Sequence, residues 1–446
     1  MLSIWSENSK LPSFDPLKGN VKTDVLIIGG GMAGILCAYF LKNAGVNYIL
    51  AEQNTICSGI TKNTTAKITS QHGLIYQKII REFGTETAKM YLDANEKAVS
   101  KFRQMCIGNK HSDNAPQIDC DFKNKPSFIY STGNQYKIEK ELTALSGLGY
   151  KAEYENRLPL PFHVSAAVKF KNQAQFNPLR FLQHISKGLN IFEHTEVKEL
   201  IGETAVTDMG KIYADKIIVA AHFPFINKHG GYFLKMYQHR SYVTALKNAA
   251  NLSGMYMDES EKGFSFRNCG DMLLVGGGAH KTGKHGGGLK YLEHASKEFY
   301  PNSEIKYEWA AQDCMTLDGI PYIGKYSSHT DKLFTATGFN KWGMTSCMIA
   351  AEILTDMILE KDNEYAKIFS PSRTVLRPQL LINGFNAAVN LLKPSANRCP
   401  HMGCALKWNE EEQSWDCPCH GSRFKKNGKL LNNPATGNLK TKKRRR

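Results

Sequence analysis

Residues 24–52 read DVLIIGGGMAGILCAYFLKNAGVNYILAE, and this stretch decides the fold of the first domain. The apolar run DVLIIGG predicts a buried strand, and the longer run AGILCAYFLKNAG predicts a helix. A further apolar run, NYILAE, predicts a second strand, and Gly45 stands where a glycine would end the helix. Strand, helix and strand in this order predict an α/β unit with a parallel sheet.

The glycines of this stretch have the spacing of a dinucleotide-binding turn. Gly29, Gly31 and Gly34 follow a G-x-G-x-x-G pattern between the predicted strand and the predicted helix. In such a turn the glycines let backbone amides approach a pyrophosphate at the positive end of the helix. Glu52 ends the next strand, where a carboxylate accepts hydrogen bonds from ribose hydroxyls and disfavours a 2′-phosphate. FAD and NAD both fit this pattern, and a glycine-rich turn beside an exposed glutamate is the plain alternative.

The length and composition describe a globular protein of more than one domain. The chain has 446 residues, of which 42% are hydrophobic and 22% are charged, enough for two or three domains with a large core. Its first residues lack the basic and apolar runs of a secretory signal. Residues 25–41 carry no charge, but the glycines at 29–31 divide them into strand and helix. We therefore expect a cytoplasmic protein without a membrane span.

The chain is basic, with a formal net charge of +16. Six of its basic residues lie in the last seven positions, KTKKRRR. Such a run is usually a solvated tail, and contact with nucleic acid or with an acidic protein is the alternative. No aromatic-rich single-strand motif or major-groove helix accompanies it, so we do not expect a nucleic-acid partner.

Between the two ends, helix-like and strand-like patterns alternate. Residues 176–189, FNPLRFLQHISKGL, predict a helix with Asn177 as its N-cap and Pro178 in its first turn. Residues 332–358, KLFTATGFNKWGMTSCMIAAEILTDMI, predict a strand, a glycine loop and a buried helix. Residues 237–310 mix strand-like runs with glycine turns, as in LLVGGGAHKTGKHGGG.

The segment SGITKNTTAKITSQHGLIY at 58–76 resembles the pyrophosphate-side segment of the D-amino-acid-oxidase-like FAD enzymes, a family that includes glycine-, sarcosine- and gamma-glutamylputrescine-oxidase-like members. Residues 174–186, 190–200, 309–324 and 335–354 are similar to later segments of that family, so the resemblance covers residues 1–370. It implies a Rossmann-like α/β domain that binds FAD and an α+β substrate domain with an antiparallel sheet. The residues expected to contact FAD are Gly29, Gly31, Met32, Ala33, Gly34, Glu52, Gln53, Thr61, Thr64, Thr65, Ala66, Val197, Gly338, Phe339, Gly343, Met344 and Thr345.

The resemblance also implies a reaction. Enzymes of this family oxidise a C–H bond beside an amine nitrogen, and the hydride passes to the flavin. His280 matches a histidine that faces the substrate, although a solvated loop histidine is as plausible an interpretation. Arg240 and Arg267 lie in the expected substrate region, where a guanidinium could pair with a substrate carboxylate or with a surface acid.

Two further positions bear on how the flavin would react. The related oxidases carry a lysine, at the position of Gly276, that assists the reaction with oxygen, and its absence favours a dehydrogenase. Cys314 loosely matches a cysteine that links covalently to flavin in some relatives, but a buried structural cysteine is the simpler interpretation.

A second group of reactive residues lies near the C-terminus. RCPHMGCALKWN at 398–409 and DCPCHGSRF at 416–424 hold four cysteines and two histidines between Cys399 and His420. The other seven cysteines are scattered, and we expect most of them to be buried as small hydrophobic residues. In a cytosolic chain such a cluster indicates a metal centre before structural disulfides.

The cluster resembles the Rieske iron–sulfur motif, in which one iron takes two thiolates and the other takes two imidazoles. The resemblance implies a [2Fe–2S] cluster held by Cys399, His401, Cys417 and His420. A Cys₂His₂ zinc site is the alternative, although the C-x-H half departs from the usual finger spacing.

The resemblance also pairs the remaining thiols, Cys404 and Cys419, in a disulfide that ties the two loops. The module is short, because the linker leads almost directly into the first loop. We therefore expect residues 421–440 to supply most of a small all-β sheet, which packing against the flavin domain completes.

The predicted domain boundaries are 1–370 for the FAD-dependent oxidoreductase, 371–397 for a linker, 398–440 for the Rieske module and 441–446 for a basic tail. Within the oxidoreductase, the FAD-binding parts are expected at about 20–80, 165–230 and 310–370, and the substrate domain at about 81–164 and 231–309.

The two ends together predict one function. A substrate gives up two electrons at once, an iron–sulfur cluster carries one, and a flavin can join the two steps. We expect an oxidoreductase that oxidises an amine or amino acid and passes electrons through its own cluster to an acceptor, such as a one-electron acceptor protein. The alternatives are a flavoprotein that modifies tRNA or another nucleic acid, and a redox-sensing regulatory protein without turnover.

Overall fold

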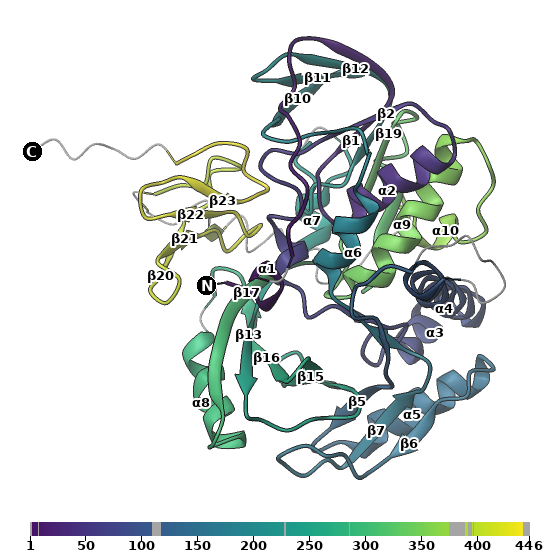
Figure 1. The fold of residues 1–446 in the computed structure, drawn as a ribbon, viewed down its shortest axis with the longest axis vertical. Coiled ribbons are helices and arrows are strands. Elements are labelled where there is room, and N and C mark those ends of the chain that lie inside the picture. The colour runs from purple at the N-terminus through teal and green to yellow at the C-terminus, as the bar shows by residue number, and fades with distance from the viewer. Residues whose placement is uncertain are drawn as a thin grey trace, which may run out of the picture.

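The computed structural model describes residues 2–7, 9–108, 117–226, 229–284, 286–373, 389–390, 395 and 397–439. Two large sheets form the body of the protein, and a small C-terminal module, yellow in Figure 1, lies against it. The predicted linker is described only in part, and the predicted basic tail lies outside the described residues.

The first large sheet contains the predicted α/β unit. Its strands follow the order β10-β11-β12-β1-β2-β9, and β19 pairs with β12 and β18. The neighbours of β1 and the pair β12–β19 run parallel, and the helix α2 (Met32–Asn43) connects β1 to β2, which confirms the predicted strand–helix–strand unit. The strands are β1 (Val21–Ile28), β2 (Tyr48–Ala51), β9 (Ile191–Phe192), β10 (Val197–Ile201), β11 (Thr204–Thr207), β12 (Lys211–Val219), β18 (Tyr322–Lys325) and β19 (Leu333–Thr337).

The second large sheet is antiparallel except where β14 meets β5, in the order β17-β13-β16-β15-β14-β5-β7-β6. The run Gly276–Gly278 lies inside β16 and not in a turn. Glycine leaves room there for the Ser265 side chain, because a Cβ on Gly276 would lie 2.5 Å from the hydroxyl oxygen of Ser265 on the next strand. The strands are β5 (Ser127–Ser131), β6 (Glu153–Glu155), β7 (Ala166–Phe170), β13 (Met236–Lys247), β14 (Met255–Asp258), β15 (Ser265–Cys269), β16 (Met272–Lys281) and β17 (Glu304–Thr316).

Helices cover the sheets and close the core. The helix α2 packs against α9 (Gly343–Ile358), and both contribute to the largest hydrophobic core (Figure 1). The helix α6 begins at its predicted cap, because the Asn177 side chain accepts the N–H groups of Leu179 and Arg180 at 3.1 Å. No helix among the described residues has both the length and the apolar composition needed to cross a membrane. The remaining elements are α1 (Ile4–Glu7), η1 (Ile60–Asn63), α3 (Tyr76–Phe83), α4 (Thr85–Ile107), α5 (Gln135–Gly147), α6 (Pro178–Ile185), α7 (Tyr232–Lys235), α8 (Leu289–Phe299), α10 (Ala366–Phe369), β3 (Lys67–Ile68), β4 (Lys123–Asn124) and β8 (Ala174–Gln175).

The C-terminal module is an antiparallel sheet in the order β20-β21-β22-β23. Its strands are β20 (Lys407–Asn409), β21 (Ser414–Asp416), β22 (Arg423–Lys425) and β23 (Leu430–Asn432). Residues 421–440 were expected to supply most of this sheet, but they supply β22 and β23 only. The other two strands lie between the two Cys/His loops in the sequence, so these strands connect one loop to the other. Its core contains the cysteines of both loops together with Leu406 and Phe424.

Candidate functional site

A large cavity lies where the two large sheets and the C-terminal module meet. Its volume is about 1640 Å³, beyond the roughly 300–1,000 Å³ of an ordinary small-molecule site. The loop after β1, strands β13, β16 and β17, and residues 435–438 of the module all contribute to its wall. The cavity therefore has room for a dinucleotide and a substrate together.

The glycine turn between β1 and α2 borders this cavity. A Cβ on Gly34 would overlap the carbonyl oxygen of Gly29, and a Cβ on Gly29 would lie 2.7 Å from the carbonyl oxygen of Ala220. Only glycine lets the turn, the helix and the sheet pack this closely. The N-cap of α2 is Gly31, which has no side chain, and the N–H of Met32 donates to the Thr61 hydroxyl at 3.0 Å. The start of the helix borders the cavity, where its positive end favours an anion.

Glu52 anchors the turn from the neighbouring strand end. Its Oε2 accepts the N–H of Gly30 at 2.7 Å and its Oε1 accepts the N–H of Asn54 at 2.9 Å. Burial raises the pKa of this carboxyl, and the two backbone hydrogen bonds work against that rise. The carboxylate lines the cavity and keeps further lone pairs, so it holds the turn and can still accept from a ligand hydroxyl.

Most residues predicted to contact FAD come together on this one surface, although they are far apart in sequence. Those that line the cavity are Gly29, Gly31, Met32, Ala33, Glu52, Gln53, Thr61, Thr64, Thr65, Val197, Phe339, Gly343 and Met344. The remaining four predicted contacts, Gly34, Ala66, Gly338 and Thr345, are not among the lining residues. Gly34 supports the turn by close packing, and the Thr345 hydroxyl bonds to the His72 ring at 3.1 Å.

The loop between β19 and α9 has an unusual backbone that the sequence did not reveal. Asn340 and Lys341 have positive φ values of 51° and 72°. The Asn340 side chain holds the loop, since it accepts the N–H of Thr316 and donates to the carbonyl of Gly338, both at 2.7 Å. Lys341 projects from this constrained loop and lines the cavity. Strained backbone of this kind is often retained at functional sites.

Arg240, predicted as a partner for a substrate carboxylate, is already paired with a carboxylate of the chain itself. Its Nε donates to Glu412 of the module at 3.0 Å, and its Nη2 bonds to the other carboxylate oxygen. Tyr242 and Arg423 also donate to Glu412, each at 2.8 Å. Burial raises the pKa of Glu412, but the two guanidinium groups outweigh it and keep that pKa below its ordinary value. Arg240 therefore joins the module to the body.

Arg267 and His280, the other predicted catalytic residues, do not line the cavity. Arg267 is 1% exposed, and its Nη1 donates to the carbonyls of Thr65 and Ala66 at 2.7 and 2.8 Å. The His280 ring stacks on Tyr242 and its Nδ1 lies 3.2 Å from the carbonyl oxygen of Gly278, on the side of the Glu412 ion pair. Burial lowers the pKa of His280. Both side chains have structural partners, and neither meets the cavity.

Cys314 and Trp309 occupy core positions, which for Cys314 agrees with the simpler interpretation of a buried structural cysteine. Cys314 is 3% exposed, packs in the hydrophobic core behind the first sheet and is not a lining residue. Trp309 borders the cavity, and its indole N–H donates to the carbonyl of Asn63 at 2.9 Å.

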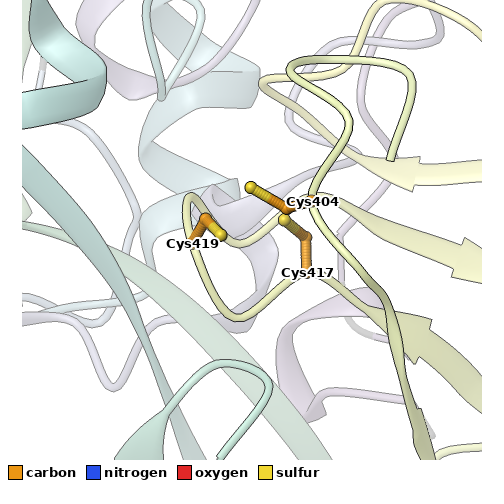
Figure 2. Close-up of side chains that lie close together, drawn as sticks. All are labelled: Cys404, Cys417 and Cys419. Carbon is orange, nitrogen blue, oxygen red and sulfur yellow. The ribbon is translucent and has the colours of Figure 1, made fainter. Parts of the chain in front are cut away.

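The Cys/His loops place their sulfur atoms close together. Figure 2 shows Cys404, Cys417 and Cys419 with their side chains converging, and their sulfur atoms all lie within 4.8 Å of one another. Cys399 is not in this trio, but its thiol shares a hydrogen bond with Cys417 that lowers the pKa of Cys417. All eleven cysteines, which are all among the described residues, are free thiols in the structure. The predicted ligand thiols and the predicted disulfide pair thus form one buried group.

The two histidines of the loops face each other. The Nδ1 atoms of His401 and His420 lie 3.3 Å apart, with the rings nearly perpendicular. Burial lowers the pKa of both imidazoles to about 4, so both are neutral near pH 7. Two neutral imidazoles with converging nitrogens beside buried thiols are a donor set that suits a Rieske cluster.

The second Cys/His loop is docked on the large antiparallel sheet. Gln238 of β13 donates to the carbonyls of His420 and Asn433 at 2.8 and 3.0 Å. Gln312 of β17 donates to the carbonyl of Gly421 at 2.9 Å.

Four functional residues were not singled out in the sequence: Gln238, Gln312, Glu412 and Lys341. For the two glutamines, the sequence shows only that polar residues interrupt the strand-like runs at QHR and AAQD, which does not reveal what those residues face.

Comparisons with known proteins agree with this arrangement. A model of the FAD dependent oxidoreductase family matches residues 24–357, and a model of the Rieske [2Fe-2S] domain matches residues 385–443. The putative Rieske 2Fe-2S iron-sulfur protein YhfW of Bacillus subtilis (strain 168) is 35% identical over 502 aligned residues, covering 98% of this chain and 97% of that protein.

Two solved structures share the fold of the larger part. Glycine oxidase from Geobacillus kaustophilus superposes with a TM-score of 0.64 at 18% identity, covering 80% of this chain and all of that one. L-proline dehydrogenase from P. horikoshii superposes with a TM-score of 0.60 at 16% identity, covering 80% of this chain and 98% of that one.

These matches assign two cofactors, FAD and a [2Fe–2S] cluster, to the chain. The cavity fits FAD, because it joins the start of α2 and a glycine turn to the loop before α9. The Cys/His loops fit the cluster, because thiols and neutral imidazoles converge there.

Proposed function

Because this chain belongs to the FAD-dependent oxidoreductase family and carries a Rieske [2Fe-2S] domain, we propose that it oxidises an amine or amino acid and passes the electrons out through its own cluster. When bound, FAD would take a hydride from the carbon beside the substrate nitrogen, and the cluster would carry electrons away one at a time. The acceptor in this proposal is a one-electron carrier, and oxygen is the poorer acceptor. Gly276 supports this choice, since no lysine stands at that position.

Each part of the chain has a defined role in this proposal. The glycine turn and Glu52 hold the dinucleotide, and the loop before α9 positions the ring end of the cofactor beside the substrate. The cluster ligands are Cys399, His401, Cys417 and His420. Cys404 and Cys419, which are free thiols in the structure with sulfur atoms within 4.8 Å of each other, would form a disulfide that ties the two loops.

The proposed domain boundaries follow the same division. Residues 1–370 form the flavin enzyme and 398–440 the cluster module. Residues 371–397 link the two parts.

The observation that carries the proposal is the docking of the second Cys/His loop on β13 and β17. Successive residues of a strand point to opposite faces of the sheet. On β17, Ala311 and Asp313 line the cavity, whereas Gln312 between them bonds to the carbonyl of Gly421. One strand layer therefore separates the cavity from the loop that is proposed to hold the cluster. This proximity favours electron transfer within one molecule.

An anaerobic reductive titration tests the proposal. Purified protein would be mixed with a panel of amines and amino acids, and optical and EPR spectra would be recorded before and after mixing. We expect a substrate that bleaches the flavin band and then produces the EPR signal of a reduced Rieske cluster. Added ferricyanide should sustain turnover better than air does. A protein that contains zinc and no flavin would rule the proposal out.

A further inference from the structure

Lys67 is a half-buried lysine on the wall of the cavity, directly after the predicted cofactor residues Thr64 to Ala66. Its Nζ donates to the Thr65 hydroxyl at 3.1 Å and lies 3.4 Å from the Ser265 hydroxyl. Both partners are neutral, and within the described part of the chain no carboxylate pairs with this ammonium. The charge thus faces the cavity without a counter-ion.

A second cation lies next to it. The Nη1 group of Arg267 donates to the carbonyls of Thr65 and Ala66, and its guanidinium packs over the ring of Trp5. Burial, with a smaller contribution from the Arg267 charge, lowers the pKa of Lys67 to about 7. The charge of Asp121 acts on Arg267, whereas no carboxylate among the described residues acts on Lys67. An anion in the cavity would therefore compensate the charge of Lys67.

Lys67 and Ser265 both line the cavity, and a glycine stands opposite Ser265 on the next strand. Gly276 pairs with Ser265 across the β15–β16 ladder, and Gly276 and Gly277 both line the cavity. A Cβ on Gly276 would lie 2.5 Å from the Ser265 hydroxyl oxygen and would cover it. The absence of a side chain therefore leaves a small polar recess around Lys67.

Two other cations on the cavity wall, Arg240 and Lys341, have acidic neighbours. Arg240 is held by Glu412. The charges of Asp313 and Glu261 act on Lys341 and partly offset the effect of burial on its pKa. Lys67 differs from both because its neighbours are hydroxyls and another cation.

We propose that Lys67, together with the hydroxyls of Thr65 and Ser265, binds the carboxylate of an amino-acid substrate. The inference rests on the proposed function and narrows it, because an amine without a carboxylate would leave the recess unfilled. An ammonium flanked by two hydroxyl donors can engage both oxygens of a carboxylate. Lys67 thus acts as a binding residue, and no proton or electron passes through it.

Acetate is a suitable probe, because it offers the carboxylate alone. Its binding to the full-length protein with cofactors would be measured by saturation-transfer NMR of the acetate methyl group, in parallel with the flavin absorbance. We expect Lys67→Met to weaken acetate binding about tenfold or more with unchanged FAD content, since a charge-assisted hydrogen bond is lost. Lys67→Arg should retain most of the affinity. Lys62→Met, which removes another lysine from the cavity wall, should bind acetate like the wild type.

The assignment would be overturned if Lys67→Met bound acetate as tightly as the wild type does. It would also be overturned if Lys67→Met lost FAD, because the lysine would then bind the cofactor. Gly276→Ala keeps every charge and places a methyl group against Ser265, so it tests the recess even if Lys67→Met fails to fold. Weaker acetate binding in Gly276→Ala supports the site, and unchanged binding contradicts it. A wild type that binds acetate through Lys67 but oxidises no amino acid would refute the proposed function while supporting the anion site.

Discussion

The cavity and the C-terminal module contrast in how their residues are distributed along the chain. The cavity is lined by residues from Ile28 to Asn438, so it exists only after both large sheets and the module have come together. The Cys/His group lies between Cys399 and His420, on two loops of one small sheet. A site built from one short segment can be recognised in the sequence with its ligands. A site built from distant segments can be recognised only in part.

The contrast reverses when the position of each site is considered. The glycine turn lies between β1 and α2, and residues close to it in the chain, Glu52 and Thr61, hold it in place. The module, by contrast, is positioned by residues of the body. Gln238 and Gln312 donate hydrogen bonds to backbone carbonyls of its second Cys/His loop, and Arg240 donates to its Glu412. Its chemistry is local, but its distance from the cavity is set by long-range contacts.

The strongest test of this contrast removes the local site and leaves the distributed one intact. Cys417→Ser replaces a fully buried sulfur that contacts the other thiols of the group. We expect complete loss of the cluster, because a serine oxygen is a poor substitute for a thiolate ligand, with unchanged FAD content. Iron analysis, EPR and flavin absorbance measure this. Cys269→Ser on β15 is the matched control, and a full cluster in Cys417→Ser would contradict the assignment.

The converse change should remove FAD and spare the cluster. Gly34→Ala drives a methyl group into the Gly29 carbonyl, and overpacking of this kind costs about 1–3 kcal/mol, or roughly ten- to a hundredfold in FAD affinity. The FAD-to-protein ratio and the iron content would be compared in the same sample. Gly59→Ala, whose Cβ would meet nothing within 4 Å, serves as the control. Equal FAD loss in both variants would show that the effect is not specific to the turn.

Where the module meets the body, we expect slower electron transfer without loss of either cofactor. Glu412→Gln leaves the guanidinium groups of Arg240 and Arg423 buried without their shared carboxylate, which costs about 3–5 kcal/mol. We expect faster proteolytic release of the module and slower reduction of the cluster after the flavin, with unchanged flavin reduction by substrate. Stopped-flow spectra at the two absorption bands separate these steps. Glu410→Gln, at an exposed neighbouring position, should behave like the wild type.

The same ion pair predicts an acid dependence. The pKa of Glu412 is lower in the folded protein than its ordinary value of 4.5. Its contribution to docking is therefore complete above about pH 4.5 and is lost as the pH falls through the lower, folded value. Release of the module should increase below that pH in the wild type. In Glu412→Gln this increase should be absent.

The smallest effect concerns Cys314, which lies in the core and away from the cavity wall. We expect Cys314→Ala to keep its full FAD content, and acid precipitation of the wild type to release all flavin into solution. Flavin that stays with the precipitated wild type but not with the variant would show a covalent link after all.

The sequence carried a large share of the fold. The strand–helix–strand unit and the Asn177 cap both followed from local rules, because each depends on neighbours in the chain. The roles proposed for Arg240, Arg267 and His280 depended instead on which face of the antiparallel sheet each side chain occupies. A strand pattern shows that faces alternate, but it does not show that a carboxylate from position 412 will cover one of them.

Local chemistry was thus determined by the sequence itself: a glycine turn at 29–34 suited to a dinucleotide, and two Cys/His loops suited to an iron–sulfur cluster. The tertiary structure alone decided which cations remain open to the cavity and how close the module lies to it. Backbone turns and ligand spacings arise from residues a few positions apart. Ion pairs and cavity walls arise only when strands such as β13 and β15 meet residues hundreds of positions away.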